Sequence, residues 1–97
     1  SFPVFKLKID MSFVRDMDTN AGNRAIVTAV IGMAKALKLE TVAEGVETAA
    51  QAALLRELHC DEAQGYLYSK AVPPQVLLQR WLQQPTAVTA PGSTPKA

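Results

Sequence analysis

The sequence TVAEGVET, residues 41–48, places two carboxylates, Glu44 and Glu47, in a run that is otherwise apolar or small. A solvated surface segment does not need the two valines of this run, and a plain core strand does not carry Glu44. Gly45 has no Cβ, and a glycine at the end of a strand often marks a place where another backbone or a ligand approaches closely. The run therefore predicts a buried strand whose end opens into a site. A strand tip with solvated glutamates is the competing interpretation.

A strand and a helix extend from this stretch. Residues 40–46 are short and apolar up to Glu44, which is typical of a parallel strand that is covered on both faces. Thr48 and Gln51 then have the spacing of a capping box, in which two side chains satisfy free backbone N–H groups at the start of a helix. This helix is expected to run to about Leu58.

The residues before this unit repeat the same order of elements. Residues 4–10 alternate between apolar and charged side chains, which predicts a strand with one charged face. Residues 18–22 supply turn and cap residues, and a helix is expected from near Asn23 to residue 37 or 38. The apolar stripe that should lie against the sheet consists of Ile26, Val27, Val30, Ile31, Ala34 and Leu37.

A third strand and a last helix are expected near the C-terminus. The strand lies near residues 62–66, and Pro73-Pro74 can open the helix because proline in the first turn removes no helical hydrogen bond. From Pro85 onward, Pro, Thr, Ala, Gly and Ser dominate without periodicity, which indicates a flexible tail. We therefore expect one domain over residues 1–84 and a tail over residues 85–97.

The alternation of three strands with three helices predicts an α/β fold with a parallel sheet. A barrel of eight such units takes about 250 residues, so three units do not close one. In barrels and in doubly wound folds, functional side chains gather at the carboxyl ends of the strands. The polar residues at the expected ends are Lys8, Asp10, Glu44, Glu47 and Gln64.

The composition argues against several classes of protein. Of the 97 residues, 48% are hydrophobic, which is enough for the core of one small domain. The formal net charge is +1, so we expect no binding to DNA or RNA that is driven by charge. We expect no signal peptide and no segment that spans a membrane. The single cysteine, Cys60, excludes an internal disulfide and fits a reducing compartment, so we expect a cytoplasmic protein.

Three motifs of this chain, taken together, resemble one known family. They are LKID at residues 7–10, VAEGVET at residues 42–48 and CDEAQGYL at residues 60–67. With the helices between them, residues 2–84 closely resemble the last three strand motifs of the EAL domain of bacterial cyclic-di-GMP phosphodiesterases. Three motifs in order at compatible spacings are far more specific than any one of them.

The resemblance implies a fold and an activity. The fold is a (β/α)8 barrel of TIM type, of which this chain would be the C-terminal three strand–helix units. The activity is hydrolysis of cyclic-di-GMP to the linear dinucleotide pGpG, in bacterial second-messenger signalling, with Mg²⁺ or Mn²⁺ ions at the strand ends. Two metal ions can lower the pKa of a bridging water, and a nearby cation offsets the charge that develops on the phosphate.

The resemblance also implies roles for individual residues. Glu44 would be the carboxylate beside the metal ions and the attacking water, and so a metal ligand and a candidate general base. Lys8 would lie beside that water and the scissile phosphate. Gln64 would order the metal-bound water or the ligand, while Glu47 and Asp10 would position the loops around the site.

Several of these residues also have a plain structural explanation. A lone strand lysine such as Lys8 is usually an exposed residue, and an aspartate such as Asp10 is usually a turn or cap residue. His59 and Cys60 are adjacent, but they lie at an expected helix end without further ligands, so we expect a buried thiol and no metal there. Lys38 and His59 stand where glycine often ends a helix, which predicts a left-handed backbone at both.

The family motifs that precede these three are missing. The Glu-x-Leu-x-Arg motif, the metal-binding Asn and Glu and the paired aspartates belong to earlier strands, so this chain alone is expected to be inactive. The alternative is a degenerate EAL module that binds cyclic-di-GMP or a partner protein without hydrolysis. A third hypothesis is a truncated product without independent function. A diguanylate cyclase or sensor domain and a second copy in a homodimer are the other partners we consider.

The pleat of the strands gives a geometric prediction. Ile9 and the other apolar residues of the first strand should face the helices, so Lys8 should lie on the opposite face. In the next strand, Val42 and Glu44 should share that opposite face. Because the like ends of parallel strands meet, Lys8 and Glu44 should lie within about 10 Å of each other, given a strand spacing of roughly 4.8 Å.

Overall fold

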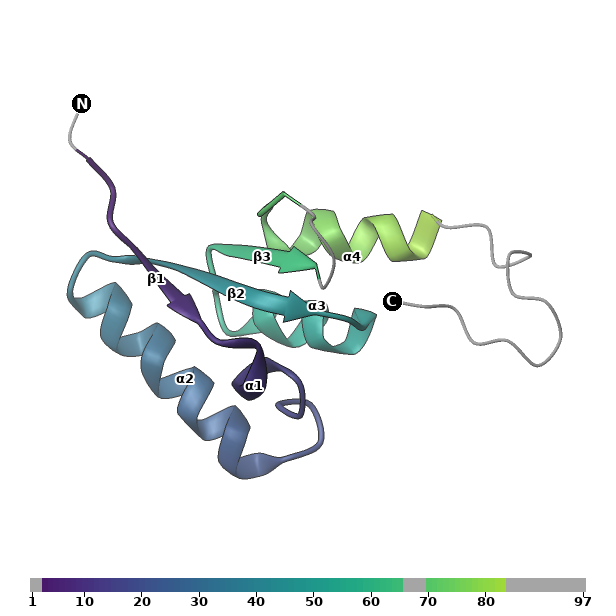
Figure 1. Ribbon diagram of the computed structural model, residues 1–97, viewed down its shortest axis with the longest axis horizontal. Coiled ribbons are helices and arrows are strands. Elements are labelled where there is room, and N and C mark those ends of the chain that lie inside the picture. The colour runs from purple at the N-terminus through teal and green to yellow at the C-terminus, as the bar shows by residue number, and fades with distance from the viewer. Residues whose placement is uncertain (1–2, 66–69, 84–97) are drawn as a thin grey trace, which may run out of the picture.

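A sheet of three parallel strands organises the computed structural model, which describes residues 3–65 and 70–83 (Figure 1). The strands are β1 (Lys6–Ile9), β2 (Glu40–Val46) and β3 (Glu62–Gly65), and they lie side by side in the order β1-β2-β3. The helices are α1 (Met11–Val14), α2 (Ala21–Ala36), α3 (Ala49–Glu57) and α4 (Pro74–Gln83). The predicted order of elements and the parallel sheet are confirmed.

Two predictions lie wholly or partly outside the described residues. The expected tail over residues 85–97 is one of them, and Tyr66 at the expected end of the third strand is the other. The prediction that the first strand begins at residue 4 is wrong, because β1 begins at Lys6. Phe5, which was expected to face the helices, is 67% exposed.

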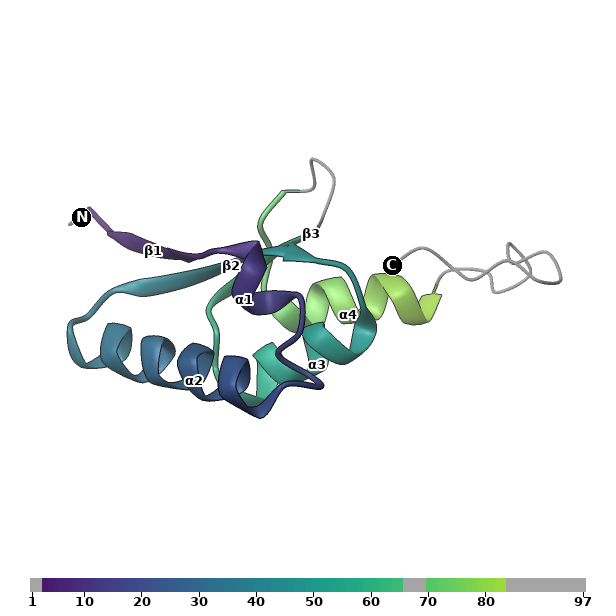
Figure 2. The same ribbon diagram turned by 60° about the horizontal axis from the view of Figure 1, so that its bottom comes forward.

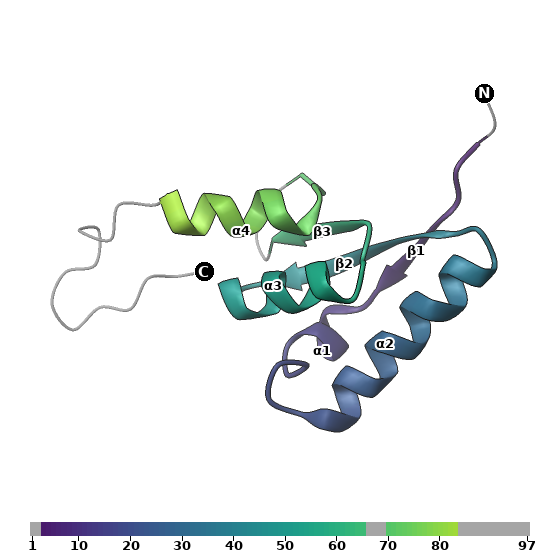
Figure 3. The same ribbon diagram turned by 180° about the vertical axis from the view of Figure 1, so that it is seen from behind.

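The helices cover one face of the sheet. In Figure 2 the sheet lies above α2, α3 and α4, and no helix of the described residues lies on its upper face. Figure 3 shows the same layer from behind, with α3 in front of β2. The expectation that the second strand is covered on both faces is therefore wrong for the described residues. We call the helix-bearing side the covered face and the other side the open face.

The covered face and the helices enclose one hydrophobic core. Each strand contributes a small or branched side chain to it, and the alanines at positions 43 and 63 let the helices approach the sheet closely. The core residues are Ile9, Val14, Met17, Val27, Ile31, Ala43, Val46, Ala52, Leu55, Cys60, Ala63 and Leu77. The core thus stabilises the sheet through the covered face, and the described side chains of the open face do not contribute to it.

Helix α2 begins at Ala21, two positions before the expected start near Asn23. The reason is the side chain of Asn20, whose oxygen accepts a hydrogen bond of 2.9 Å from the backbone N–H of Asn23 and so caps the helix. The expected apolar stripe is also too wide, because Ile26 is 43% exposed and Leu37 is 61% exposed. The buried residues of α2 are Val27, Ile31 and Ala34.

Local backbone signals were predicted more accurately. The capping box of α3 is present, with the Thr48 hydroxyl on the N–H of Gln51 and the Gln51 side chain on the N–H of Thr48. Lys38 and His59 have left-handed φ angles of 62° and 65°, as predicted. These conformations end α2 and α3 and turn the chain back toward the sheet.

The outer edge of β3 is partly paired. The Ala63 N–H donates to the Val72 carbonyl over 2.6 Å, and the Val72 N–H donates to the Ala63 carbonyl over 3.0 Å, in an antiparallel bridge. This bridge occupies backbone groups that would otherwise be free to pair with another chain. Among the helices in residues 3–65 and 70–83, none has the length and apolar character needed to cross a membrane.

Candidate active site

Lys8 and Glu44 lie together on the open face, at the carboxyl ends of β1 and β2. Lys8 pairs in register with Val42, so Glu44 lies two residues further along the neighbouring strand and on the same face. Lys8 Nζ is 3.8 Å from Glu44 Oε2, and the two side chains are 72% and 34% exposed. The prediction that these residues share one face and one end of the sheet is confirmed.

An irregularity in the sheet changes the alternation of β2 between Ala43 and Val46. Ala43 pairs with Ala63 and Val46 pairs with Gly65, so on β2 two residues, Glu44 and Gly45, lie opposite the single residue between Ala63 and Gly65 on β3. This is a β-bulge, a feature that often occurs next to active sites and changes the direction of a side chain. Ala43 and Val46 are both fully buried in the core, although simple alternation would place them on opposite faces. The bulge thus leaves Glu44 on the open face and returns the chain to the core.

Gly45 makes this bulge possible. Its φ angle is 70°, a left-handed conformation that a side chain would strain. A Cβ at this position would lie 2.5 Å from the Cβ of Met11 on α1, which is far inside van der Waals contact. The close approach that the sequence predicted at Gly45 is therefore an approach of α1 to the end of β2.

Asp10 caps the helix that follows β1. Its carboxylate accepts a hydrogen bond of 2.9 Å from the Ser12 N–H and one of 2.6 Å from the Ser12 hydroxyl. These two bonds, the hydroxyl first, lower the pKa of Asp10 from its ordinary value. The stabilisation from this cap is therefore present above the ordinary pKa and is lost as the pH falls through the lowered one. In this way Asp10 orders the chain directly after Lys8.

Glu47 and Gln64 lie around the same end of the sheet. Glu47 is in the loop after β2, and its backbone N–H donates to Gln51 Oε1 over 2.8 Å. Gln64 is the residue of β3 that lies opposite the bulge. It follows the buried Ala63 and so belongs to the open face by alternation. All five residues selected from the sequence thus belong to the ends of the strands or to the loops directly after them.

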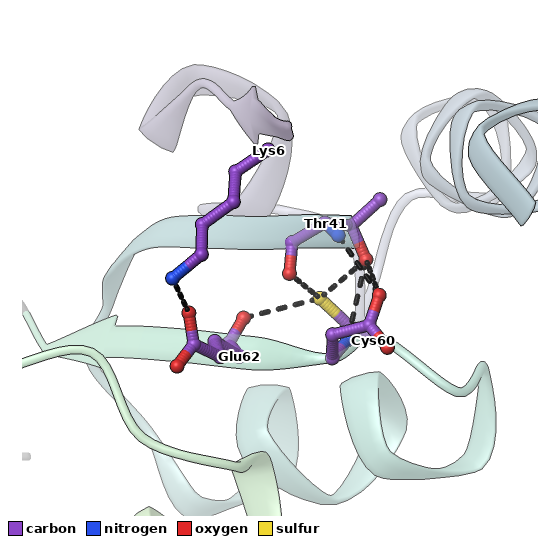
Figure 4. Close-up of polar contacts among 5 residues, drawn as sticks. Lys6, Thr41, Cys60 and Glu62 are labelled. Carbon is purple, nitrogen blue, oxygen red and sulfur yellow. Dashed lines mark hydrogen bonds and ion pairs between the residues drawn. The ribbon is translucent and has the colours of Figure 1, made fainter. Parts of the chain in front are cut away.

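A second ion pair on the open face was not predicted. Lys6 Nζ lies 2.9 Å from Glu62 Oε1, and Figure 4 shows the lysine reaching from β1 across β2 to β3. The hydrogen bond to Glu62 and its charge raise the pKa of Lys6. Val42 lies in register beside Glu62 and is only 6% exposed, although no helix within residues 3–65 and 70–83 covers this face. The two partners of this ion pair are 56 residues apart in the sequence. The alternation that places Lys6 on the same face as Lys8 was the one sequence signal that could have indicated the pair.

A hydrogen-bonded cluster at the opposite end of the sheet was also missed. The fully buried Thr41 hydroxyl accepts from the Asp61 N–H over 3.2 Å, and the Asp61 carboxylate accepts from the Thr41 N–H over 2.9 Å. Cys60 is buried beside them, and its thiol donates to the Glu62 carbonyl over 3.2 Å (Figure 4). Burial raises the pKa of the Cys60 thiol, which keeps it protonated and unreactive. The expectation of a buried Cys60 is confirmed, and this cluster joins the start of β2 to the start of β3.

The described residues do not form a complete metal site. No three His, Cys, Asp or Glu side chains within residues 3–65 and 70–83 lie close enough together to hold an ion. Glu44 offers one carboxylate, which is paired with a lysine rather than with further acidic groups. A divalent ion at this site would need ligands from outside these residues.

The comparison with known families gives the chain its place. Residues 1–71 match the family model described as the EAL domain, which is well over half of the chain. The chain belongs to the EAL domain family. The resemblance on the LKID, VAEGVET and CDEAQGYL motifs is therefore confirmed, and all three motifs fall within the matched residues.

Individual EAL proteins match most of this chain but are much longer. The signaling protein YkoW of Bacillus subtilis is 44% identical over 85 residues, which are 88% of this chain and 11% of YkoW. The cyclic di-GMP phosphodiesterase NbdA of Pseudomonas aeruginosa is 48% identical over 71 residues, which are 73% of this chain and 9% of NbdA. The chain therefore spans about a tenth of the length of these two relatives.

A solved structure supports the same assignment. The PaMucR phosphodiesterase in its c-di-GMP complex aligns with a TM-score of 0.63 at 39% identity, over 79% of this chain and 31% of that chain. The solved neighbours are EAL domains of TIM-barrel type, so the predicted fold class, three strand–helix units of such a barrel, is confirmed. The open face of the sheet corresponds to the inner wall of a barrel, because the helices form the outer layer.

Proposed function

We propose that this chain supplies one wall of the active site of a cyclic-di-GMP phosphodiesterase, which hydrolyses its substrate to linear pGpG. The observation that carries the proposal is the meeting of Lys8 and Glu44, 3.8 Å apart, on the open face at the strand ends. Active sites of TIM barrels lie at this end of the strands. The relatives named as phosphodiesterases, and the PaMucR complex with c-di-GMP, support the choice of substrate.

The two residues have complementary tasks in the proposed reaction. Glu44 takes a proton from the attacking water, since a carboxylate within reach of a water can act as a general base. Lys8 holds its ammonium group beside the phosphate and offsets the negative charge that develops there. In the absence of substrate the two charges pair with each other, and the high exposure of Lys8 leaves it free to turn to a phosphate.

The other selected residues act through position. Asp10 orders α1 through Ser12, Glu47 lies in the loop after β2, and Gln64 lies opposite the bulge that carries Glu44. Mg²⁺ or Mn²⁺ belongs to the proposal as the ion that would supply an activated water, with Glu44 as one ligand and the remaining ligands from preceding strands. We place the activity in the cytoplasm, which the free thiol of Cys60 fits.

The test uses a complete domain, by which we mean an EAL domain of eight strand–helix units whose last three are residues 1–83 of this chain. Glu44→Gln should lower the rate of pGpG formation by about 10²–10⁴, the range expected for loss of a general base. Binding of cyclic-di-GMP should persist when calcium replaces magnesium in the buffer. Linear product separated by chromatography reports the rate, and calorimetry reports the binding.

Glu62→Gln is the matched control, because it makes the same chemical change on the same face. Glu62 pairs with Lys6 rather than with Lys8, so its substitution should leave the rate within about twofold. Near-normal turnover by Glu44→Gln would refute the proposed role. Binding without any turnover by the unmodified complete domain would instead support a degenerate module that binds its ligand without hydrolysis.

A further inference from the structure

Gln51 is a polar side chain that the structure buries at the start of α3. It is 3% exposed, which is rare for a glutamine in the first turn of a helix. Its Oε1 atom accepts two hydrogen bonds, one of 2.8 Å from the Glu47 N–H and one of 3.2 Å from the Thr48 N–H. The acceptor half of the amide therefore holds the loop that follows β2, which is the loop directly after Glu44.

The donor half of the same amide reaches the other loop. Gln51 Nε2 donates over 2.9 Å to the carbonyl of Arg15, which is 36 residues earlier in the chain. Arg15 is the C-cap of α1, the short helix that follows β1 and Lys8. One buried side chain thus bonds to both of the loops that follow the strands of the candidate site.

These loops need such a connection. The register between β1 and β2 ends where Ile9 pairs with Ala43, so Glu44 already lies beyond the last paired residue. Beyond that point, α1 contacts the bulge through Met11, whose Cβ lies close to Gly45. The hydrogen bond from Gln51 to Arg15 fixes α1 from its other end, so the two loops form one unit.

We propose that Gln51 is a positioning residue, which joins the loops after β1 and β2 and so fixes the distance between Lys8 and Glu44. The inference rests on the proposed function, because it concerns the geometry of that site. An amide suits the position because it carries an acceptor and a donor at its two ends. A carboxylate could complete the capping box, but it could not donate to the Arg15 carbonyl.

The test separates the two halves of the amide. Gln51→Glu retains the acceptor for the loop after β2 and loses the donor to Arg15. Thr48→Ala is the matched control, because it removes the side-chain cap of α3 and leaves the bond from Gln51 to Arg15 in place. In the complete domain, Gln51→Glu should lower kcat about 10–100-fold with KM within about twofold, because small displacements of catalytic groups cost rate rather than binding. Thr48→Ala should leave kcat within about twofold.

A second measurement tests the bond between Gln51 and Arg15 and needs no enzymatic activity. The Arg15 N–H donates to the Met11 carbonyl within α1, so it exchanges faster when α1 loses the bond from Gln51 to the Arg15 carbonyl. Amide hydrogen exchange of the 97-residue chain should therefore become at least tenfold faster at the Arg15 N–H in Gln51→Glu, while the Glu47 and Thr48 N–H groups keep their protection. In Thr48→Ala the Arg15 N–H should exchange at the rate of the unmodified chain. If Gln51→Glu fails to fold, Gln51→Met replaces it, with the same expectations for kcat and for Arg15.

These experiments can overturn the proposed role of Gln51 in three ways. Unchanged kcat and unchanged exchange at Arg15 in the Gln51 variants would overturn the inference, and so would an equal loss of kcat in Thr48→Ala. Fast exchange at Glu47 and Thr48 in the unmodified chain would also overturn it, because the loops would then not be held. An inactive complete domain would count against the proposed function alone, since the exchange rates still report the connection.

Discussion

The two faces of the sheet consist of alternate residues of the same three strands, yet they have opposite character. On the covered face, Ile9, Ala43 and Ala63 are at most 3% exposed and pack against the helices. On the open face, Lys8 and Glu44 keep 72% and 34% of their side-chain area exposed. The comparison shows that the residues that stabilise the fold and the residues proposed for catalysis lie on different faces of the sheet, because neighbouring residues of a strand point to opposite faces.

The bulge at Glu44 and Gly45 changes which residues of β2 point to each face. One extra residue on β2 shifts the alternation, so that Val46 is buried in the core on the same side of the sheet as Ala43. A regular strand would have placed either Glu44 in the core or Val46 on the open face. The predictions below change one face at a time and ask whether the other face responds.

The largest change in stability is expected from the helices that cover the sheet. Leu55 on α3 is fully buried in the core, and Leu55→Ala would leave a cavity under the sheet. The free energy of unfolding should fall by about 2–5 kcal/mol, the usual range for such truncations. Urea denaturation of the 97-residue chain, followed by the fluorescence of Trp81, measures this fall. A loss below about 1 kcal/mol would mean that the covered face does not carry the stability.

A smaller loss is expected at the start of the covered face. Thr41→Val keeps the shape of the side chain and removes the hydroxyl that accepts from the Asp61 N–H. Because Thr41 is fully buried, the groups left without a partner should lower the free energy of unfolding by about 1–3 kcal/mol. The same urea experiment measures the change. Equal stability of Thr41→Val and the unmodified chain would show that the cluster with Asp61 is not needed.

The smallest effect is expected on the open face. Lys6→Met breaks the pair with Glu62, in which the lysine side chain is 46% exposed and the glutamate side chain 25%. Exposed pairs are screened by water and salt, so the urea midpoint should stay within the error of the measurement. The comparison of midpoints at low and high salt serves as the control. A fall comparable to that of Leu55→Ala would contradict the division between the two faces.

Local signals in the sequence predicted much of this fold. Lys8 and Glu44 are 36 residues apart, but the alternation within each strand and the parallel order of the strands placed them on one face. The capping box at Thr48 and Gln51 and the left-handed residues Lys38 and His59 depend on residues a few positions apart. Periodicity and cap chemistry describe such short distances well. The start of α2 was predicted two residues late because several residues of the turn at 18–22 can cap a helix, and the sequence does not show that Asn20 is the one that does.

The features that were missed join distant parts of the chain. The pair of Lys6 with Glu62 spans 56 residues, and the bond from Gln51 to Arg15 spans 36. No local pattern specifies such partners, since they depend on the register between strands and on the angle of each helix. The bulge was also missed. A glycine in a strand indicates a close approach, but it does not show which face the following residues will occupy.

The central claim is that Lys8 and Glu44 act together on the open face of an EAL domain. A double-mutant cycle on the hydrolysis of cyclic-di-GMP by the complete domain tests it, with Lys8→Met, Glu44→Gln and the two changes combined. Residues that act as a unit give effects that are far from additive. We predict that the double variant is within about threefold of Glu44→Gln alone. Losses that multiply, as they would for residues at separate sites, would contradict the account.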